Sequence, residues 1–178
     1  MKKLNWKNII RTIFVCFATL PFLCCGYSFA PQGNYIDKRI QKVYVESFGN
    51  KTAQAEIENY VRTAFINQLI QYSRLKVVGS TEAADAIIKG TILNYNTIAL
   101  SYRANTLAAE ERATVTLELT FRERESGKII WSSKNINGTV EYTLEDNINL
   151  FPIIRKNALT KLANDTAEKA FNLMMAGF

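Results

Sequence analysis

Apolar and polar positions recur along the chain with two different periods, which predict strands followed by helices. Residues 42–48 alternate between apolar and polar side chains, as is typical of a strand with one buried face. After a polar break, apolar residues recur every three or four positions from Ala53 to about Tyr72, with Thr52 as the expected N-cap. The first third of the mature chain is therefore expected to form a strand and an amphipathic helix.

The middle of the chain predicts a sheet. Residues 74–79 and about 85–100 form two expected strands, followed by a polar loop at 102–111 that is longer than a tight hairpin needs. Residues 113–121 alternate strictly and are the clearest strand in the sequence.

The turn at residues 125–128 suits a two-residue hairpin and sets a register. If Glu125 lies opposite Lys128, then Ile136 lies beside Leu117 on a continuous inner face. The same register places Trp131 on the outer face.

That outer face is rich in threonine and asparagine, and Trp131, Thr116 and Asn135 are its candidate partner-contact residues. A large aromatic on a polar face indicates a contact surface. The alternative is a solvated sheet face with one tolerated aromatic, because single exposed apolar residues are ordinary.

A second long helix closes the chain. Asn149 is the expected N-cap, Pro152 fits the first turn, and the helix is expected to extend to about Met175, with Gly177 ending it. The element order predicts an α+β fold, a two-layer sandwich with both helices packed on one face of a mixed four- to five-stranded sheet.

Residues 1–24 have the features of a lipoprotein signal peptide. A basic stretch precedes an apolar run at residues 13–23, which is too short to span a bilayer. Cleavage is expected before Cys25, with acyl chains such as palmitate on that cysteine; Cys24 is the rival acceptor, and an ordinary secreted or membrane-anchored leader is the alternative.

Residues 25–41 then form a lipidated tether, and residues 42–178 form a single domain. Gly26 after the cysteine favours the periplasmic side of a Gram-negative outer membrane.

The charge and the missing residue types exclude several functions. The formal charge is +6, but four of the 22 basic residues lie in the leader, which leaves 18 basic and 16 acidic residues. This near-neutral body argues against nucleic-acid binding. The chain has no histidine, and its three cysteines lie at positions 16, 24 and 25, so no enzyme, metal site, cofactor or disulfide framework is expected in the body.

Short motifs in the mature chain occur in the order seen in one known family. They are Cys25-Gly26-Tyr27-Ser28-Phe29 after the leader, residues 43–52 (VYVESFGNKT), the pair Ala84-Asp85 and the triplet Gly90-Thr91-Ile92. With this element order, residues 42–178 resemble the LptE family of lipopolysaccharide-assembly lipoproteins.

The resemblance implies a partner rather than a reaction. An LptE-like protein plugs the lumen of the outer-membrane β-barrel LptD, assists its assembly and helps deliver lipopolysaccharide to the outer leaflet. Lipid A phosphates need cations, so Arg103 and Arg112, which flank the expected loop, are candidate lipopolysaccharide contacts; solvated loop charges are the alternative.

Two other classes stay open. One is a periplasmic regulatory lipoprotein that resembles the activators of cell-wall synthases or the amino-terminal domain of TolB. The other is a subunit of a secretion pore. Either would bind a protein partner, and recovery of the native complex would distinguish them.

Overall fold

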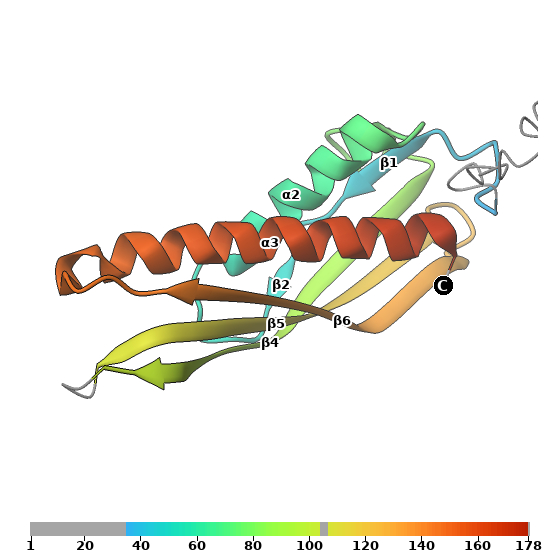
Figure 1. The fold of residues 1–178 in the computed structure, drawn as a ribbon. Coiled ribbons are helices and arrows are strands. Elements are labelled where there is room, and N and C mark those ends of the chain that lie inside the picture. The colour runs from blue at the N-terminus through green and yellow to red at the C-terminus, as the bar shows by residue number, and fades with distance from the viewer. Residues whose placement is uncertain (1–34, 104–106, 178) are drawn as a thin grey trace, which may run out of the picture. The chain divides into compact units, whose positions relative to one another are not determined.

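The computed structural model describes residues 35–103 and 107–177 (Figure 1). The predicted leader, Cys25 and most of the predicted tether lie outside the described residues. By its contacts the chain divides into Met1–Pro31 and Gln32–Phe178. The buried cluster of the second unit begins at Ile36 and ends at Met175 among the described residues, so this unit encloses its own core.

The strands form one mixed sheet. They are β1 (Lys42–Val45), β2 (Gly49–Asn50), β3 (Lys76–Val77), β4 (Ala86–Tyr102), β5 (Ala108–Glu123) and β6 (Ile129–Thr143). Their order is β3-β1-β4-β5-β6, with β2 paired to β4 off this path. β1 runs parallel to both of its neighbours, whereas β4, β5 and β6 are antiparallel. The predicted mixed sheet is confirmed.

Two helices make the second layer on one face of this sheet (Figure 1). They are α2 (Ile57–Tyr72) and α3 (Phe151–Ala176), and the single-turn η2 (Ile148–Leu150) leads directly into α3. Both turn an apolar stripe toward the sheet, which confirms the predicted two-layer α+β architecture.

The first helix begins later than predicted. Its first residue is Ile57, after Glu56 in a left-handed conformation with φ of 65°. Thr52 does not cap it: its hydroxyl donates to the Asn50 side chain at 2.8 Å and accepts the Gln54 amide at 3.2 Å. The threonine therefore stabilises a turn ahead of the helix, which is the competing use of such side chains.

The second helix begins and ends close to the predicted residues, but its N-cap differs from the predicted one. Pro152 lies in the first turn, and Gly177 ends the helix at φ of 81°. Asn149 is not the N-cap, because it belongs to η2 and its amide donates to the side chain of Asn147 at 3.1 Å. A short tight turn thus precedes the helix.

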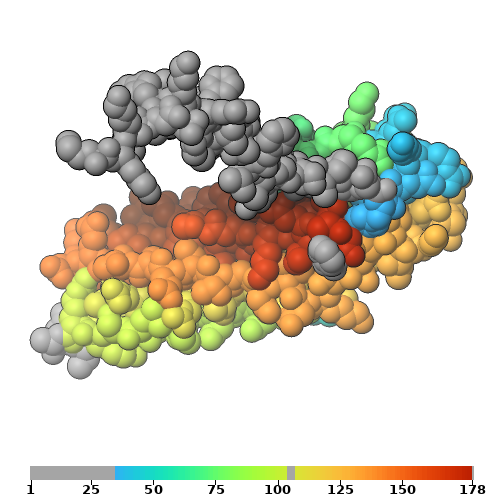
Figure 2. Space-filling view, turned by 45° about the vertical axis from the view of Figure 1, so that its right-hand side comes forward, coloured from blue at the N-terminus to red at the C-terminus, as the bar shows by residue number. Residues whose placement is uncertain are grey.

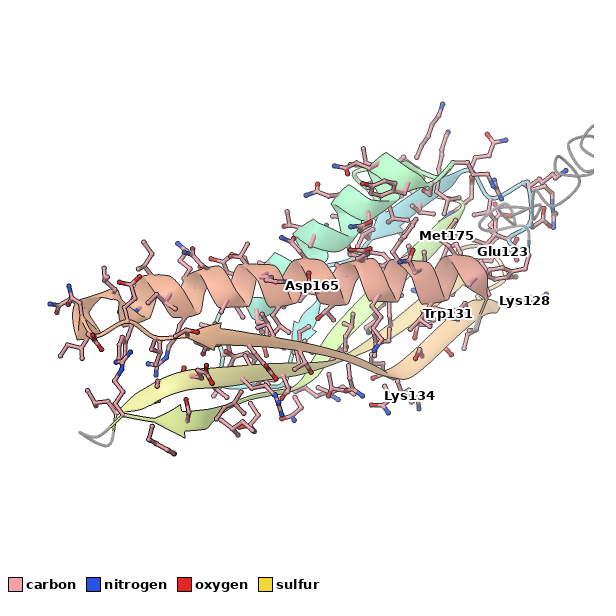
Figure 3. All side chains as sticks on the ribbon, in the orientation of Figure 1. Glu123, Lys128, Trp131, Lys134, Asp165 and Met175 are labelled. Carbon is pink, nitrogen blue, oxygen red and sulfur yellow. The ribbon has the colours of Figure 1, made fainter. Side chains whose placement is uncertain are left out.

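The β5–β6 hairpin keeps the predicted register at Leu117 beside Ile136 but loses it toward the turn. A shift in β6 after this pair brings Trp131 beside Phe121. Trp131 is only 6% exposed and belongs to the core cluster, near the C-terminal end of α3 (Figure 3). The predicted outer-face position of Trp131 is therefore wrong, because one extra residue in a strand reverses the face of every residue after it.

Two loop predictions also change. Residues 124–127 form the β5–β6 turn, and the Glu123 amide donates to the Lys128 carbonyl at 2.9 Å, so Glu125 does not lie opposite Lys128. Half of the predicted loop at 102–111 belongs to strands, since β4 ends at residue 102 and β5 begins at residue 108. In a long hairpin the backbone N–H and C=O groups of these polar residues form hydrogen bonds between the strands, and no hydrophobic core is needed behind them.

No helix among the described residues is both long enough and apolar enough to cross a bilayer.

Candidate binding surfaces

A polar ladder covers the side of the sheet that faces away from the helices. Thr116 and Asn137 are register partners on β5 and β6, and the threonine hydroxyl donates to the asparagine side-chain oxygen at 2.9 Å. The Asn137 amide then donates to the side-chain oxygen of Asn135 at 3.0 Å. Two of the predicted contact residues, Thr116 and Asn135, therefore lie together on the outer face, while Trp131 points into the core.

The ladder continues across neighbouring strands. Asn94 is the β4 partner of Thr116, and Asn96 is the partner of Thr114. These side chains carry amide and hydroxyl groups that donate and accept hydrogen bonds. The outer face therefore offers a sheet-wide set of uncharged hydrogen-bonding groups to water or to a partner.

Arg112 lies on the outer face with a carboxylate beside it. Its Nε and Nη2 donate to Oε1 of Glu141 on β6 at 2.9 and 2.5 Å, and both side chains are well exposed. An exposed pair of this kind contributes at most about 1 kcal/mol to stability. An anionic ligand could replace the carboxylate at little energetic cost to the fold.

Arg103 joins the end of the β4–β5 hairpin to the segment after β6. Its guanidinium donates to the backbone carbonyls of Leu144 and, at 2.8 Å, Glu145, and its Nε lies 3.2 Å from the carboxylate of Asp146. Hydrogen bonds from a charged donor to fixed carbonyls are stronger than neutral ones. Arg103 therefore has a structural role, and Arg112 and Arg103 do not share one ligand-binding geometry.

An ion pair between a buried carboxylate and a half-exposed arginine lies under the same end of the sheet, and sequence reasoning missed it. Glu111 is 6% exposed, and it accepts Arg155 Nε at 3.0 Å, Arg155 Nη2 at 2.5 Å and the Tyr142 hydroxyl at 2.7 Å. The hydrogen bonds from Arg155 lower the pKa of the Glu111 carboxyl, and burial, followed by the contact with Glu111, raises the pKa of Tyr142. The sequence pattern did mark Glu111 as inward-facing, because it lies two residues before Ala113 and therefore on the same side of the strand.

A hollow of about 560 Å³ opens beside this ion pair, between the start of α2, the inner side of β4 and the first turns of α3. Tyr60, Tyr95 and Lys156 are among its lining residues. The tyrosine rings and hydroxyls and the lysine ammonium group could contact a partner that carries polar groups. Among the described residues no cluster of three or more histidine, cysteine, aspartate or glutamate side chains could hold a metal ion.

Large apolar side chains are exposed along the β4–β5 hairpin. They are Ile98, Leu100, Tyr102 and Leu107. The hairpin and the start of α3 lie at one end of the described body, and the first described residues lie toward the other (Figures 1 and 2). The apolar hairpin is thus far from the point where the chain enters the fold.

Comparison with solved structures gives neighbours of the same fold. An uncharacterized lipoprotein B from Nitrosomonas europaea is 18% identical, with a TM-score of 0.52 over 77% of this chain and 83% of that one. PelC from Paraburkholderia phytofirmans, solved as a dodecamer, is 15% identical, with a TM-score of 0.52 over 78% and 91% of the two chains. At these identities the likeness shows the fold alone. No curated protein matches the sequence.

The sequence model of one family covers most of the described body. It is the model of LptE, described as lipopolysaccharide-assembly, and it matches residues 40–174 of the 178. This match spans every strand and both helices up to the last turn of α3. The chain therefore belongs to the LptE family of lipopolysaccharide-assembly proteins.

Proposed function

We propose that this protein is a non-enzymatic lipoprotein of the outer membrane, held on its periplasmic side by acyl chains on Cys25. It plugs an LptD-like β-barrel, assists the assembly of that barrel and helps deliver lipopolysaccharide to the outer leaflet. Membership of the LptE family is the observation that carries this proposal.

The open sheet face supports a position inside a barrel. The lumen of a large transmembrane barrel is polar, so an inserted protein needs uncharged hydrogen-bonding groups on its surface. The ladder through Thr116, Asn137 and Asn135 supplies such groups on the side that no helix covers. Core-forming apolar residues, including Trp131, lie on the opposite side of the sheet.

The length of the body also fits a barrel. The 26 residues of α3 span about 39 Å at the usual rise of 1.5 Å per residue. A bilayer with its headgroup regions is about 40–45 Å thick. A body held in the lumen along the axis of α3 would therefore extend from one membrane surface to the other.

The test is recovery of the native complex with a position-specific crosslinker. The lipidated chain carries a photo-crosslinking residue at Asn137, on the polar ladder, or at Ser126, in the β5–β6 turn at the opposite end from the β4–β5 hairpin. We expect a large β-barrel to copurify in stoichiometric amount and to crosslink to the Asn137 variant far more than to the Ser126 variant. Recovery alone, or with a peptidoglycan synthase, would reject the plug and favour a regulatory lipoprotein.

Contact of Arg103 and Arg112 with lipopolysaccharide stays a prediction. Each arginine has an acidic partner, Asp146 or Glu141, that a lipid A phosphate would have to displace. The two single alanine variants separate the roles, since only Arg103 also holds backbone carbonyls. Unchanged lipopolysaccharide affinity in both variants would remove this contact from the proposal.

A further inference from the structure

Cations gather where the described chain enters the fold. Lys42 and Lys76 are register partners at the start of β1 and β3, and Lys38 lies just before them. All three side chains are exposed, and within residues 35–103 and 107–177 they form no ion pair or side-chain hydrogen bond. Their charges are therefore open to an external anion.

The nearby acidic groups are already engaged. Asp37 accepts Arg39 Nη2 at 2.7 Å, and this hydrogen bond lowers the pKa of Asp37 to about 2. Asp85 accepts the backbone amides of Gln41 and Lys42 at 2.9 and 2.8 Å. With Arg39, Arg74 and Arg124 included, six cations lie near four carboxylates, since Glu123 and Glu125 line the same surface hollow as Arg39 and Asp85. This end of the body therefore has a small positive excess.

Two exposed apolar side chains lie at the end of α2, just before the segment that leads into β3. Ile70 and Tyr72, in the last turn of α2, are 62% and 61% exposed. Arg74 follows them and donates to the carbonyls of Ile40 at 2.9 Å and Ile36 at 3.0 Å, which fixes the end of α2 against the entering chain. A tyrosine and an aliphatic side chain among cations is the composition that favours a membrane interface.

The candidate lipid attachment is close along the chain. Only nine residues lie between Cys25 and Tyr35, and the ten Cα-to-Cα steps from one to the other span at most about 35 Å when fully extended. The β4–β5 hairpin lies at the other end of the described body (Figure 1). A membrane that holds Cys25 therefore lies within reach of the cationic end of the body.

We propose that this entry surface, made of Lys38, Lys42, Lys76, Ile70 and Tyr72, rests on the anionic phospholipid headgroups of the membrane that anchors the chain. Each lysine near such a surface strengthens binding about fivefold, while Ile70 and Tyr72 enter the headgroup layer. The proposal rests on the anchor at Cys25 but not on the barrel partner. It adds a second membrane contact that would orient the body on its tether.

The test uses residues 26–178, which contain the self-contained unit without the lipid anchor. Binding is measured by cosedimentation with vesicles of phosphatidylcholine alone or with added phosphatidylglycerol, at low and high salt. We expect the anionic vesicles to bind the chain and high salt to release it. A variant with Lys38→Gln, Lys42→Gln and Lys76→Gln should bind them at least about tenfold more weakly.

Matched variants separate the surface from net charge and from general hydrophobicity. Lys51→Gln, Lys156→Gln and Lys161→Gln remove the same charge elsewhere and should weaken binding far less. Ile70→Ser with Tyr72→Ser should weaken binding, whereas Ile148→Ser with Ile153→Ser, at the opposite end, should not.

Each variant is first checked for folding by the emission of Trp131, the only tryptophan after residue 25 and a buried one. Equal losses in the two lysine variants, or no preference for anionic vesicles, would overturn the proposal. A barrel that still copurifies after such a result would leave the proposed function standing.

Discussion

At the scale of single residues, the fold depends on places where α3 approaches the sheet very closely. A β-carbon built on Gly138 of β6 would lie 1.9 Å from the hydroxyl oxygen of Thr166 and 3.0 Å from its β-carbon. Thr166 is fully buried, and its hydroxyl donates to the Leu162 carbonyl at 2.6 Å. The missing side chain at position 138 is therefore what lets the helix pack on the strand.

Gly138→Ala should destabilise the protein by about 1–3 kcal/mol, because the new methyl group forces α3 away from β6. Urea unfolding of residues 26–178 measures the loss. Gly79→Ala is the control, since nothing lies within 4 Å of a β-carbon at that position, and its effect should be small. Equal effects of the two substitutions would show that α3 is not held this closely.

The buried carboxylate predicts a pH effect with a definite sign. Hydrogen bonds from Arg155 lower the pKa of the Glu111 carboxyl in the folded protein. The ionised carboxylate therefore stabilises the fold at any pH above the pKa that Glu111 has in the unfolded chain. This stability is lost as the pH falls through the lower pKa of the folded protein. Glu111→Gln should cost about 2 kcal/mol at pH 7 and reduce the loss of stability on acidification below pH 5. Glu141→Gln, in the exposed pair with Arg112, should change little. Parallel pH profiles for wild type and Glu111→Gln would contradict the role of the Glu111–Arg155 ion pair.

At the scale of elements, the sequence predicted the layers because their cause is periodic. Strict alternation in β5 and a broad helical stripe in α3 each determine one buried face, and both are as predicted. The side of Trp131 was not predictable, because a bulge in β6 has no periodic signature. Glu111 was missed for the opposite reason: the pattern marked its position as inward, but only the fold supplies its distant partner Arg155.

The contacts of Arg103 predict how the β4–β5 hairpin moves. Its guanidinium links the hairpin end to the carbonyls of residues 144 and 145, beside the Leu144 amide, which donates to the Ala109 carbonyl at 2.8 Å. Arg103→Ala should raise amide hydrogen exchange in the last residues of β4 and in residues 144–146, because local opening no longer breaks those bonds. Arg112→Ala, which removes only an exposed ion pair, should leave exchange there unchanged. Similar exchange in the two variants would mean that other contacts hold the hairpin.

At the scale of the whole described body, the proposed contacts are separated along its length. The polar ladder of β5 and β6 faces one way from the sheet, and the cationic entry surface lies at the end opposite the β4–β5 hairpin (Figures 1 and 2). The first is suited to a protein partner and the second to lipid headgroups. Mutations at one surface should therefore leave binding at the other intact, since sites this far apart and without shared partners are usually independent.

The position of β1 has a mechanical consequence. This strand is the first among the described residues, yet it lies inside the sheet, between β3 and β4 and parallel to both. If the far end of the body is held, a force that pulls on the N-terminal side of the chain acts along β1. Such a force loads the hydrogen bonds of β1 to β3 and to β4 in shear. Two contacts would bear the force before these hydrogen bonds do: the bond from the Tyr35 hydroxyl to the Met174 carbonyl, and the bonds from Arg74 to the entering chain. Pulling the chain from residue 26 against residue 103 should give one high-force rupture, whereas gradual peeling at low force would show that β1 resists no such load.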